Sequence, residues 1–261
     1  MPLTPARLSS GVSTARYPTD QFGFYPKNMP VAANYYENDF NTYAAGDWTV
    51  APATGTSALS AGLGGQLTLT TGAVSGNGQG NALTPVSFAF TPGYQTWFSI
   101  NFVLVSQLLP NWVVGLTAGG ASAPTSGVYW TKATSSRNVN FLINKASSIT
   151  TITSATTVAD AVSVALGIYY DGKGIANLYG YSSTGLTGAT QTTPSPTAFG
   201  TPPIYGGTRV CSASNDGINV NPLTNLPTVN LQPSFFVQTN ASSTVTMIVD
   251  YVIASCEIAR F

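Results

Sequence analysis

The feature that most constrains the fold is a two-residue alternation of apolar and polar side chains. In residues 66–71 (QLTLTT), Leu67 and Leu69 alternate with polar neighbours. The same alternation recurs in three further segments, residues 97–105, 139–143 and 162–168. Because successive side chains of a strand point to opposite faces of a sheet, the pattern predicts strands with one buried face. No segment shows the 3.6-residue period of an amphipathic helix, so we expect an all-β fold.

Two other segments indicate how the strands are arranged. Residues 245–258 are apolar on both faces, which predicts a strand in the middle of a sheet. The sequence Asp-Gly-Lys-Gly at 171–174 predicts a hairpin turn, with its return strand at 175–181, because glycine supplies the positive φ that tight turns need. Uncharged stretches rich in Gly, Ser, Thr and Pro are predicted to be loops, at 72–82, 119–125 and 184–204. Short strands joined by such turns favour a β-sandwich.

The chain carries very little charge. Only 7% of its residues are charged, against about 25% in an ordinary soluble domain, and nine basic residues balance nine acidic ones. A protein that binds a phosphate backbone needs a basic patch, so we expect no nucleic-acid partner. A surface with so few charges is poorly protected against association, which favours a protein that is covered by partners.

Metal and cofactor sites are not expected. The chain has no histidine, which is the commonest metal ligand and general base, and a zinc site would need four ligands where the chain has two cysteines. For Cys211 and Cys256 we favour buried thiols over a disulfide, without excluding the bond. The best apolar stretch, residues 98–110, is too short to span a bilayer, so no membrane partner is expected.

Residues 1–33 differ from the rest of the chain. Five prolines prevent regular secondary structure there, yet the segment is richer in aromatic residues than a disordered tail. We therefore predict an extended N-terminal arm that docks on another surface, followed by one domain at 34–261. The residues expected to make its capsid or subunit contacts are Tyr17, Phe22, Phe24, Tyr25 and Met29.

Several segments of the domain resemble a known family. They are NYYENDF at 34–40, GGQLTLTTG at 64–72, WFSINFVLV at 97–105, LGIYYDGKG at 166–174 and DYV at 250–252. Together they resemble the concanavalin-like jelly rolls of tailed-phage virion proteins, of the capsid decoration or cement type. The resemblance covers about residues 34–258 and implies a single lectin-like jelly-roll sandwich. The family includes glycan-binding lectins, glycoside hydrolases and capsid modules, so the fold alone does not choose among these functions.

Hydrolysis is not expected. A glycosidase needs two carboxyl groups that face each other across the sugar. The only glutamates are Glu37 and Glu257, which are far apart in the sequence, and no Glu-x-Asp-x-Glu strand is present. We predict that the chain is not an enzyme.

Glycan binding is the alternative that the residues leave open. Aromatic faces with neighbouring amides suffice for sugar recognition, and Trp112, Tyr129 and Trp130 could supply them, together with Tyr179 and Tyr181. The same aromatic residues could instead fill the core or line subunit contacts, where Trp and Tyr are also common.

The resemblance, the low charge and the aromatic arm together predict a structural virion protein, a phage capsid decoration or cement protein. Its expected partners are the major capsid protein and further copies of itself, with a trimer as one option. Its expected location is the capsid exterior, after assembly in the host cytoplasm. The alternative is a glycan-binding, lectin-like module of a phage fibre or surface protein.

Overall fold

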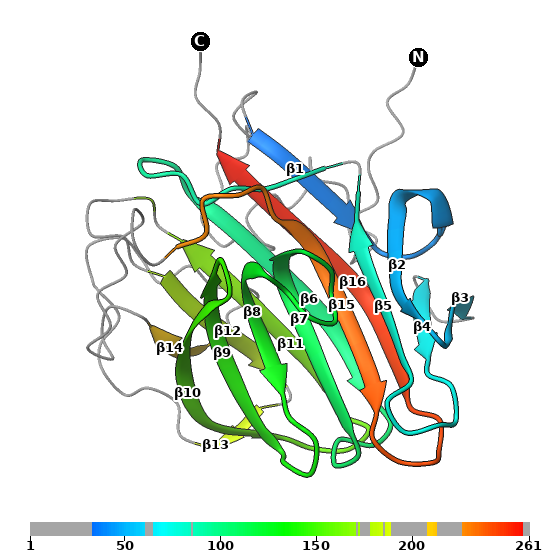
Figure 1. The fold of residues 1–261 in the computed structure, drawn as a ribbon. Coiled ribbons are helices and arrows are strands. Elements are labelled where there is room, and N and C mark those ends of the chain that lie inside the picture. Colours follow the sequence, from blue (N-terminus) through cyan, green and yellow to red (C-terminus); the bar gives the residue numbers. More distant parts are fainter. Residues whose placement is uncertain are drawn as a thin grey trace.

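The computed structural model describes residues 33–60, 65–84, 86–170, 172, 178–184, 186–188, 208–212 and 226–257. Within these ranges the chain forms two eight-stranded antiparallel sheets that pack face to face, with a single 3-10 turn, η1 (Ala45–Asp47), and no α-helix (Figure 1). This confirms the predicted all-β jelly-roll sandwich. The described residues contain no helix long and apolar enough to cross a membrane. The predicted arm lies outside the described residues, apart from Ala33.

The first sheet is built around the C-terminal strand. That strand, β16 (Thr246–Glu257), pairs with β6 (Thr96–Leu104) along one side and with β4 (Gln66–Thr70) and then β1 (Ala33–Asn38) along the other, so it is central as predicted. The order across the sheet is β14 (Thr208–Ser212), β12 (Leu178–Thr184), β11 (Ser163–Tyr170), β6 (Thr96–Leu104), β16 (Thr246–Glu257), β4 (Gln66–Thr70) and β3 (Thr56–Ser60), with β1 (Ala33–Asn38) also on β16.

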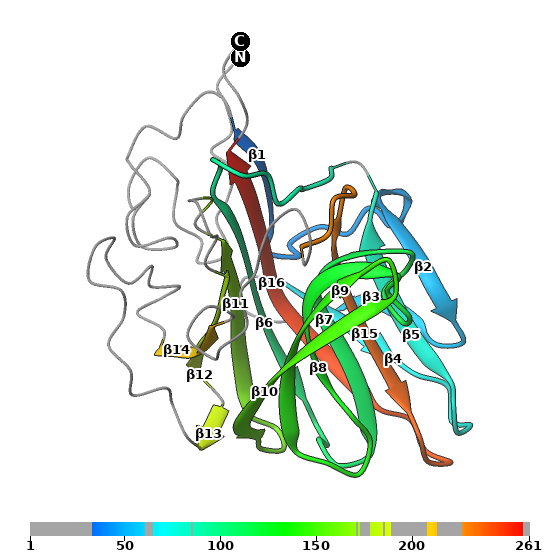
Figure 2. The ribbon, with the colours of Figure 1, turned by 60° about the vertical axis from the view of Figure 1, so that its left-hand side comes forward.

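The second sheet forms the other layer, which Figure 2 shows beside the first. Its order is β13 (Leu186–Gly188), β10 (Ser148–Val158), β9 (Asn138–Lys145), β8 (Ser126–Lys132), β7 (Pro110–Ala118), β15 (Gln232–Thr239), β5 (Gly78–Leu83) and β2 (Trp48–Ala53).

The core lies between the sheets and follows the alternation seen in the sequence. On β6, Phe98, Ile100 and Phe102 are fully buried, as the pattern predicts. They belong to the same buried cluster as Trp112 and Val114 of β7 in the opposite sheet. Each such side chain contributes about 1.5–3 kcal/mol by leaving water, so the cluster supplies much of the free energy of folding.

Two of the turn predictions meet described residues. The hairpin after β11 is confirmed: Tyr170 pairs with Leu178, and Gly172 between them has φ 68°. Its described return strand begins at Leu178. Residues 119–125 are a loop, as predicted, and most of 184–204 lies outside the described residues.

The predicted loop at 72–82 is partly wrong, because β5 begins at Gly78 and all its residues are buried. The phenyl ring of Phe236 lies over this strand, and a Cβ on Gly78 would come within 2.7 Å of it. Glycine is therefore needed here for a close approach and not for a turn. The inward residue Gln79 donates a hydrogen bond to Ser57 Oγ (2.8 Å), and Ser57 donates one to Asn81 (2.8 Å). A strand with glycines and amides on its faces lacks the apolar alternation on which the prediction depended.

Candidate functional site

The aromatic residues proposed as a sugar platform lie in the protein interior. Trp112 and Trp130 are fully buried, and their indole N–H groups donate to Gln107 Oε1 (3.3 Å) and to the carbonyl of Gly167 (3.1 Å). Tyr129 packs in a second buried cluster with Phe236 and others, and burial raises the pKa of its hydroxyl. The assignment of these three residues to glycan binding is thus wrong, because no sugar can reach their faces, and the core interpretation holds. The side chains of Tyr179 and Tyr181 lie outside the described residues.

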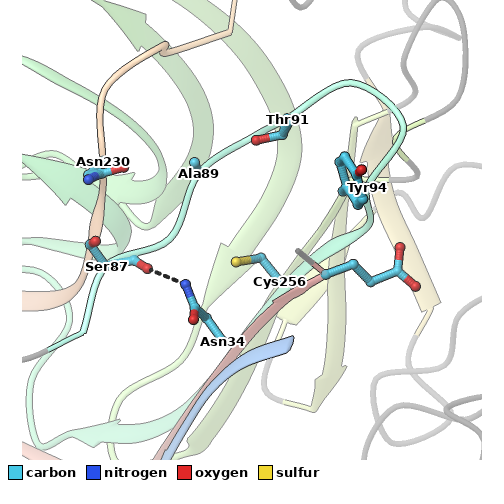
Figure 3. A pocket seen from close by; sticks show the side chains of 8 residues that line it. Asn34, Ser87, Ala89, Thr91, Tyr94, Asn230 and Cys256 are labelled. Carbon is cyan, nitrogen blue, oxygen red and sulfur yellow. Dashed lines mark hydrogen bonds between the residues drawn. The ribbon is translucent and has the colours of Figure 1, made fainter. Parts of the chain in front are cut away.

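A different set of residues surrounds a pocket of about 300 Å³ at the end of the sandwich where β1 begins and β16 ends (Figure 3). Ala89 and the buried Cys256 also line it. The polar residues around the pocket are Asn34, Ser87, Thr91, Tyr94, Asn230 and Glu257.

Backbone pairing brings these distant segments together. Asn34 of β1 and Thr96 of β6 both lie opposite Cys256 of β16. The segment that precedes β6 then crosses the end of the sandwich and is held by two reciprocal backbone hydrogen bonds of 2.7 Å between Phe88 and Leu231. The Asn34 side chain also donates to the carbonyl of Ser87 (3.3 Å), as Figure 3 shows. Asn34 and the segment that contains Ser87 are therefore held in place by backbone pairing and this bond.

A tight turn holds Tyr94 against the neighbouring hairpin. The amide of Tyr94 donates to the Thr91 carbonyl (3.1 Å), and the amide of Gly93 donates to the Gly172 carbonyl (2.5 Å). Gly93 has φ 91°, and a Cβ on Gly172 would lie 2.5 Å from the Tyr94 carbonyl oxygen. Both positions need glycine, one for its positive φ and the other also for close contact. The two glycines thus fix Tyr94, which carries the only aromatic ring among the described residues that line the pocket.

The carboxylate of Glu257 is held next to this turn. Its Oε2 accepts the backbone N–H of Gln95 (2.8 Å), and its own N–H donates to the Gln95 carbonyl (2.9 Å). Gln95 in turn donates through its side chain to the Tyr169 hydroxyl (3.1 Å). Glu257 is the one charged group among the described residues that line the pocket.

Cys256 contributes a neutral thiol. It is 3% exposed, it forms no disulfide, and burial raises its pKa. Figure 3 shows its sulfur directed into the space between Asn34 and Ala89. The buried-thiol prediction is therefore confirmed for Cys256, whereas the side chain of Cys211 lies outside the described residues.

Several polar groups around the pocket are not used within the protein. Across the described part of the chain, the side chains of Ser87, Thr91, Tyr94 and Asn230 form no hydrogen bond to another residue. Pockets that present a few convergent polar groups beside an aromatic or apolar surface are the usual sites of small-molecule binding. The lining offers neutral donors and acceptors, one ring and one carboxylate, which suits a polar, hydroxyl-rich ligand. No group of three or more metal-ligating side chains occurs among the residues described.

The two glutamates do not form a catalytic pair. They lie on neighbouring strands, but Glu37 is opposite Ile253 whereas Glu257 is opposite Ala33. Their backbones are therefore about 13 Å apart along the strands, more than the spacing of carboxyl pairs in glycosidases. That the chain is not an enzyme remains a prediction, with which this spacing agrees.

Comparison with known proteins identifies the fold. No protein-family model and no curated protein matches the sequence. Among solved structures, a protein of unknown function, SO2946 from Shewanella oneidensis MR-1, superposes with a TM-score of 0.53 at 11% identity, over 90% of this chain and 91% of that one. Peanut lectin with a bound peptide gives 0.52 at 10%, over 88% and 99%. Lectin UEA-II complexed with galactose gives 0.52 at 12%, over 86% and 99%. The chain thus has the concanavalin/legume-lectin-like sandwich fold.

Proposed function

We propose that this chain is a carbohydrate-binding module and that the pocket between β1, β16 and the segment before β6 is its binding site. The observation that carries the proposal is the group of unused hydrogen-bonding side chains, Ser87, Thr91, Tyr94 and Asn230, around one pocket. Ser87 and Tyr94 are half-buried and Thr91 and Asn230 are exposed, so water takes the place of a protein partner and a ligand that supplies hydroxyl groups can replace it. The galactose complex of a lectin with the same fold supports this choice of ligand class.

The size of the pocket favours a single sugar residue. Its volume of about 300 Å³ is at the lower end of the range for small-molecule sites. A hexose has about twelve non-hydrogen atoms, and about 0.3 kcal/mol per atom gives a Kd of about 2 mM. We therefore expect weak monosaccharide binding, with higher affinity reached only when several modules act together.

The first experiment titrates the protein with galactose, glucose and mannose up to about 50 mM while amide chemical shifts are recorded by NMR. Binding at the pocket should shift amides near Thr91, Asn230 and Cys256. The variant Asn230→Ala should weaken binding at least about fivefold, because one neutral hydrogen bond contributes about 1 kcal/mol. Asn138→Ala is the matched control, since this asparagine is also exposed, its side chain has no hydrogen bond among the described residues, and it begins β9 at the opposite end of the sandwich. Equal losses in both variants, or shifts confined to other surfaces, would refute the site.

A second readout uses the thiol inside the pocket. Cys256 should react slowly with a small methanethiosulfonate, because it is buried and its pKa is raised. A sugar in the pocket should slow the reaction further, and peptide mass spectrometry locates the label at Cys256. Unchanged labelling at saturating sugar would place the ligand elsewhere.

A second proposal is the structural role in a virion, with the major capsid protein and further copies of the chain as partners on the capsid exterior. What favours it is a weakly charged surface: the described residues form one ion pair, Arg137 with Asp160, and expose Val74, Val105, Leu108 and Leu109. The arm residues on which it mainly depends, Tyr17, Phe22, Phe24, Tyr25 and Met29, lie outside the described residues.

Deleting residues 1–30 should abolish co-sedimentation with phage particles and leave a folded β-rich protein. Retained co-sedimentation would refute the role of the arm. Both proposals are compatible with a module of a phage fibre or surface protein.

A further inference from the structure

We infer that Glu257 makes the pocket selective for the charge of its ligand, so that ammonium-bearing sugars bind best, neutral sugars bind less well and acidic sugars are rejected. This inference rests on the proposed function and specifies the class of saccharide. It is drawn from how the Glu257 carboxylate is held and from the charge of its neighbours.

The carboxylate is fixed, and one of its oxygens is available. Oε2 accepts the backbone N–H of Gln95 at 2.8 Å, which holds the side chain beside Tyr94. Oε1 has no hydrogen-bond partner among the described residues, and Glu257 lines the pocket. A ligand that extends to the Tyr94 side of the pocket can therefore meet a carboxylate oxygen whose position is already set, without an additional cost for ordering the side chain.

A carboxylate places a definite demand on the ligand. When ionised it accepts hydrogen bonds and donates none, so a group beside Oε1 must carry a proton. A sugar hydroxyl satisfies this demand, and an ammonium group satisfies it better, because a hydrogen bond between opposite charges is about twice as strong as a neutral one. An amino sugar should accordingly bind about tenfold more tightly than its neutral counterpart.

Nothing in the described lining offsets this negative charge. The remaining lining residues are neutral, and no lysine or arginine is among those that the structure describes there. A sugar carboxylate would lie in a recessed site near a like charge, where the effective dielectric constant is well below that of water. We expect an acidic sugar to bind at least about tenfold more weakly than the neutral one.

The experiment compares three sugars with one skeleton, galactosamine, galactose and galacturonic acid, at pH 6 and low salt, by NMR titration of the full chain. The expected order of affinity is the amine, then the neutral sugar, then the acid. In Glu257→Gln the amine should lose about tenfold, the acid should gain about as much, and galactose should change less than threefold. Glutamine still offers a carbonyl oxygen to the Gln95 N–H, so the end of β16 should remain in place.

The chain offers a matched control, because Glu37 is its only other glutamate and lies on the neighbouring strand β1, outside the pocket lining. Glu37→Gln removes the same net charge and should leave the order of the three sugars intact. An unchanged order in Glu257→Gln, or an equal change in Glu37→Gln, overturns the inference while galactose binding still supports the proposed function. If none of the three sugars binds and glucose and mannose fail as well, both are wrong.

A second measurement needs no variant. Raising the salt concentration from about 0.01 M to 1 M shortens the screening length from about 30 Å to 3 Å. In the wild-type protein the difference between galactosamine and galacturonic acid should shrink, while galactose affinity stays constant. A charge-independent difference between the sugars would not respond to salt, and that result would also overturn the inference.

Discussion

At the end of the sandwich opposite the pocket, polar side chains bond to the protein itself, whereas at the pocket end several of them bond to nothing in the described chain. We call the first region the turn end: the turns after β6, β8, β10 and β15. There Arg137 pairs with one carboxylate oxygen of Asp160 at 2.6 Å. The other oxygen of Asp160 accepts a hydrogen bond from the backbone N–H of Gln107, also at 2.6 Å. Gln107 in turn accepts the indole N–H of Trp112. Each of these bonds is made within the protein, and only the side-chain Nε2 of Gln107 is buried there without a partner among the described residues.

Lys132 shows how far this internal satisfaction goes at the turn end. The register places it opposite Trp112 and Val139, and it is fully buried. Its ammonium group donates to the carbonyls of Ala133 (3.0 Å) and Ser136 (2.9 Å), which are part of the turn after β8. Burial, together with the nearby Arg137, lowers its pKa to about 8. Even this buried charge is hydrogen-bonded within the protein, to carbonyl groups of the turn.

The contrast separates polar groups that the fold itself uses from polar groups that the proposed ligand would use. At the turn end, removing a side chain leaves a buried partner unsatisfied, which costs stability. At the pocket end, Thr91 and Asn230 are exposed, and their removal leaves no described partner without a hydrogen bond. Substitutions at the two ends should therefore divide between loss of stability and loss of binding.

The largest effect is expected from Trp112→Ala at the turn end. This substitution leaves a cavity at a fully buried site next to Phe102, whose ring centroid lies 5.2 Å from that of Trp112. It also leaves Gln107 Oε1 without its hydrogen-bond donor. The free energy of unfolding should fall by about 3–5 kcal/mol. Urea unfolding followed by fluorescence measures this change. Galactose affinity of the fraction that remains folded should stay within about twofold of wild type, and a selective loss of binding would return Trp112 to the glycan site.

A smaller effect is expected from the pH dependence of Lys132. Its pKa of about 8 in the folded protein is below the 10.5 of an exposed lysine, so the unfolded chain binds more protons between these values. Stability should therefore rise with pH in this window, by about 1–2 kcal/mol from pH 8 to 9.5. In Lys132→Met this rise should disappear.

The comparison between wild type and Lys132→Met should be made by urea unfolding at several pH values, because other groups also titrate. Tyr36 has its pKa raised to about 12 by burial, so its ionisation disfavours the folded state at high pH in both proteins. The difference between the two curves isolates Lys132. Parallel curves would mean that the ammonium group is not buried in solution.

The sequence predicts those strands best that bury an apolar face. The alternation at 97–105 and the doubly apolar segment at 245–258 gave β6 and the central β16, because periodicity reports directly which face a strand buries. The strand β5 was missed because its inward residues, Gln79 and Asn81, are polar. Its glycines are required by the contact with Phe236 of the neighbouring strand, which the sequence does not show.

The pocket could not be predicted in the same way. Its residues come from β1, from the segment before β6, from residue 230 and from the end of β16, and none of them forms a motif. The pairing of β16 with both β1 and β6, together with the bridge between Phe88 and Leu231, brings them together. Trp112 and Trp130, by contrast, attract attention in a sequence, but a large aromatic side chain is as common in a core as in a binding site.

A more modest effect is expected from Asp160→Ala at the turn end. The pair with Arg137 is partly exposed and contributes little by itself, so most of the loss should come from the Gln107 amide, which would lose its acceptor. We expect the Tm to fall by about 2–4 °C. Bonding to Arg137 lowers the pKa of Asp160, so the wild-type advantage should persist at neutral pH and vanish as the pH falls through that lowered pKa. Calorimetry at pH 7 and at a series of pH values below 4 tests both statements.

The smallest change in stability is expected at the pocket end, and it provides the strictest test of the contrast. Asn230→Ala and Thr91→Ala remove exposed side chains that have no described partner, so the free energy of unfolding should change by less than about 0.5 kcal/mol. The same substitutions should weaken sugar binding at least about fivefold, because each removes a hydrogen bond that only the ligand makes. Urea unfolding and NMR titration of one sample give both quantities. A loss of 2 kcal/mol or more in either variant would mean that these side chains hold the fold together, and the distinction between the two ends of the sandwich would fail.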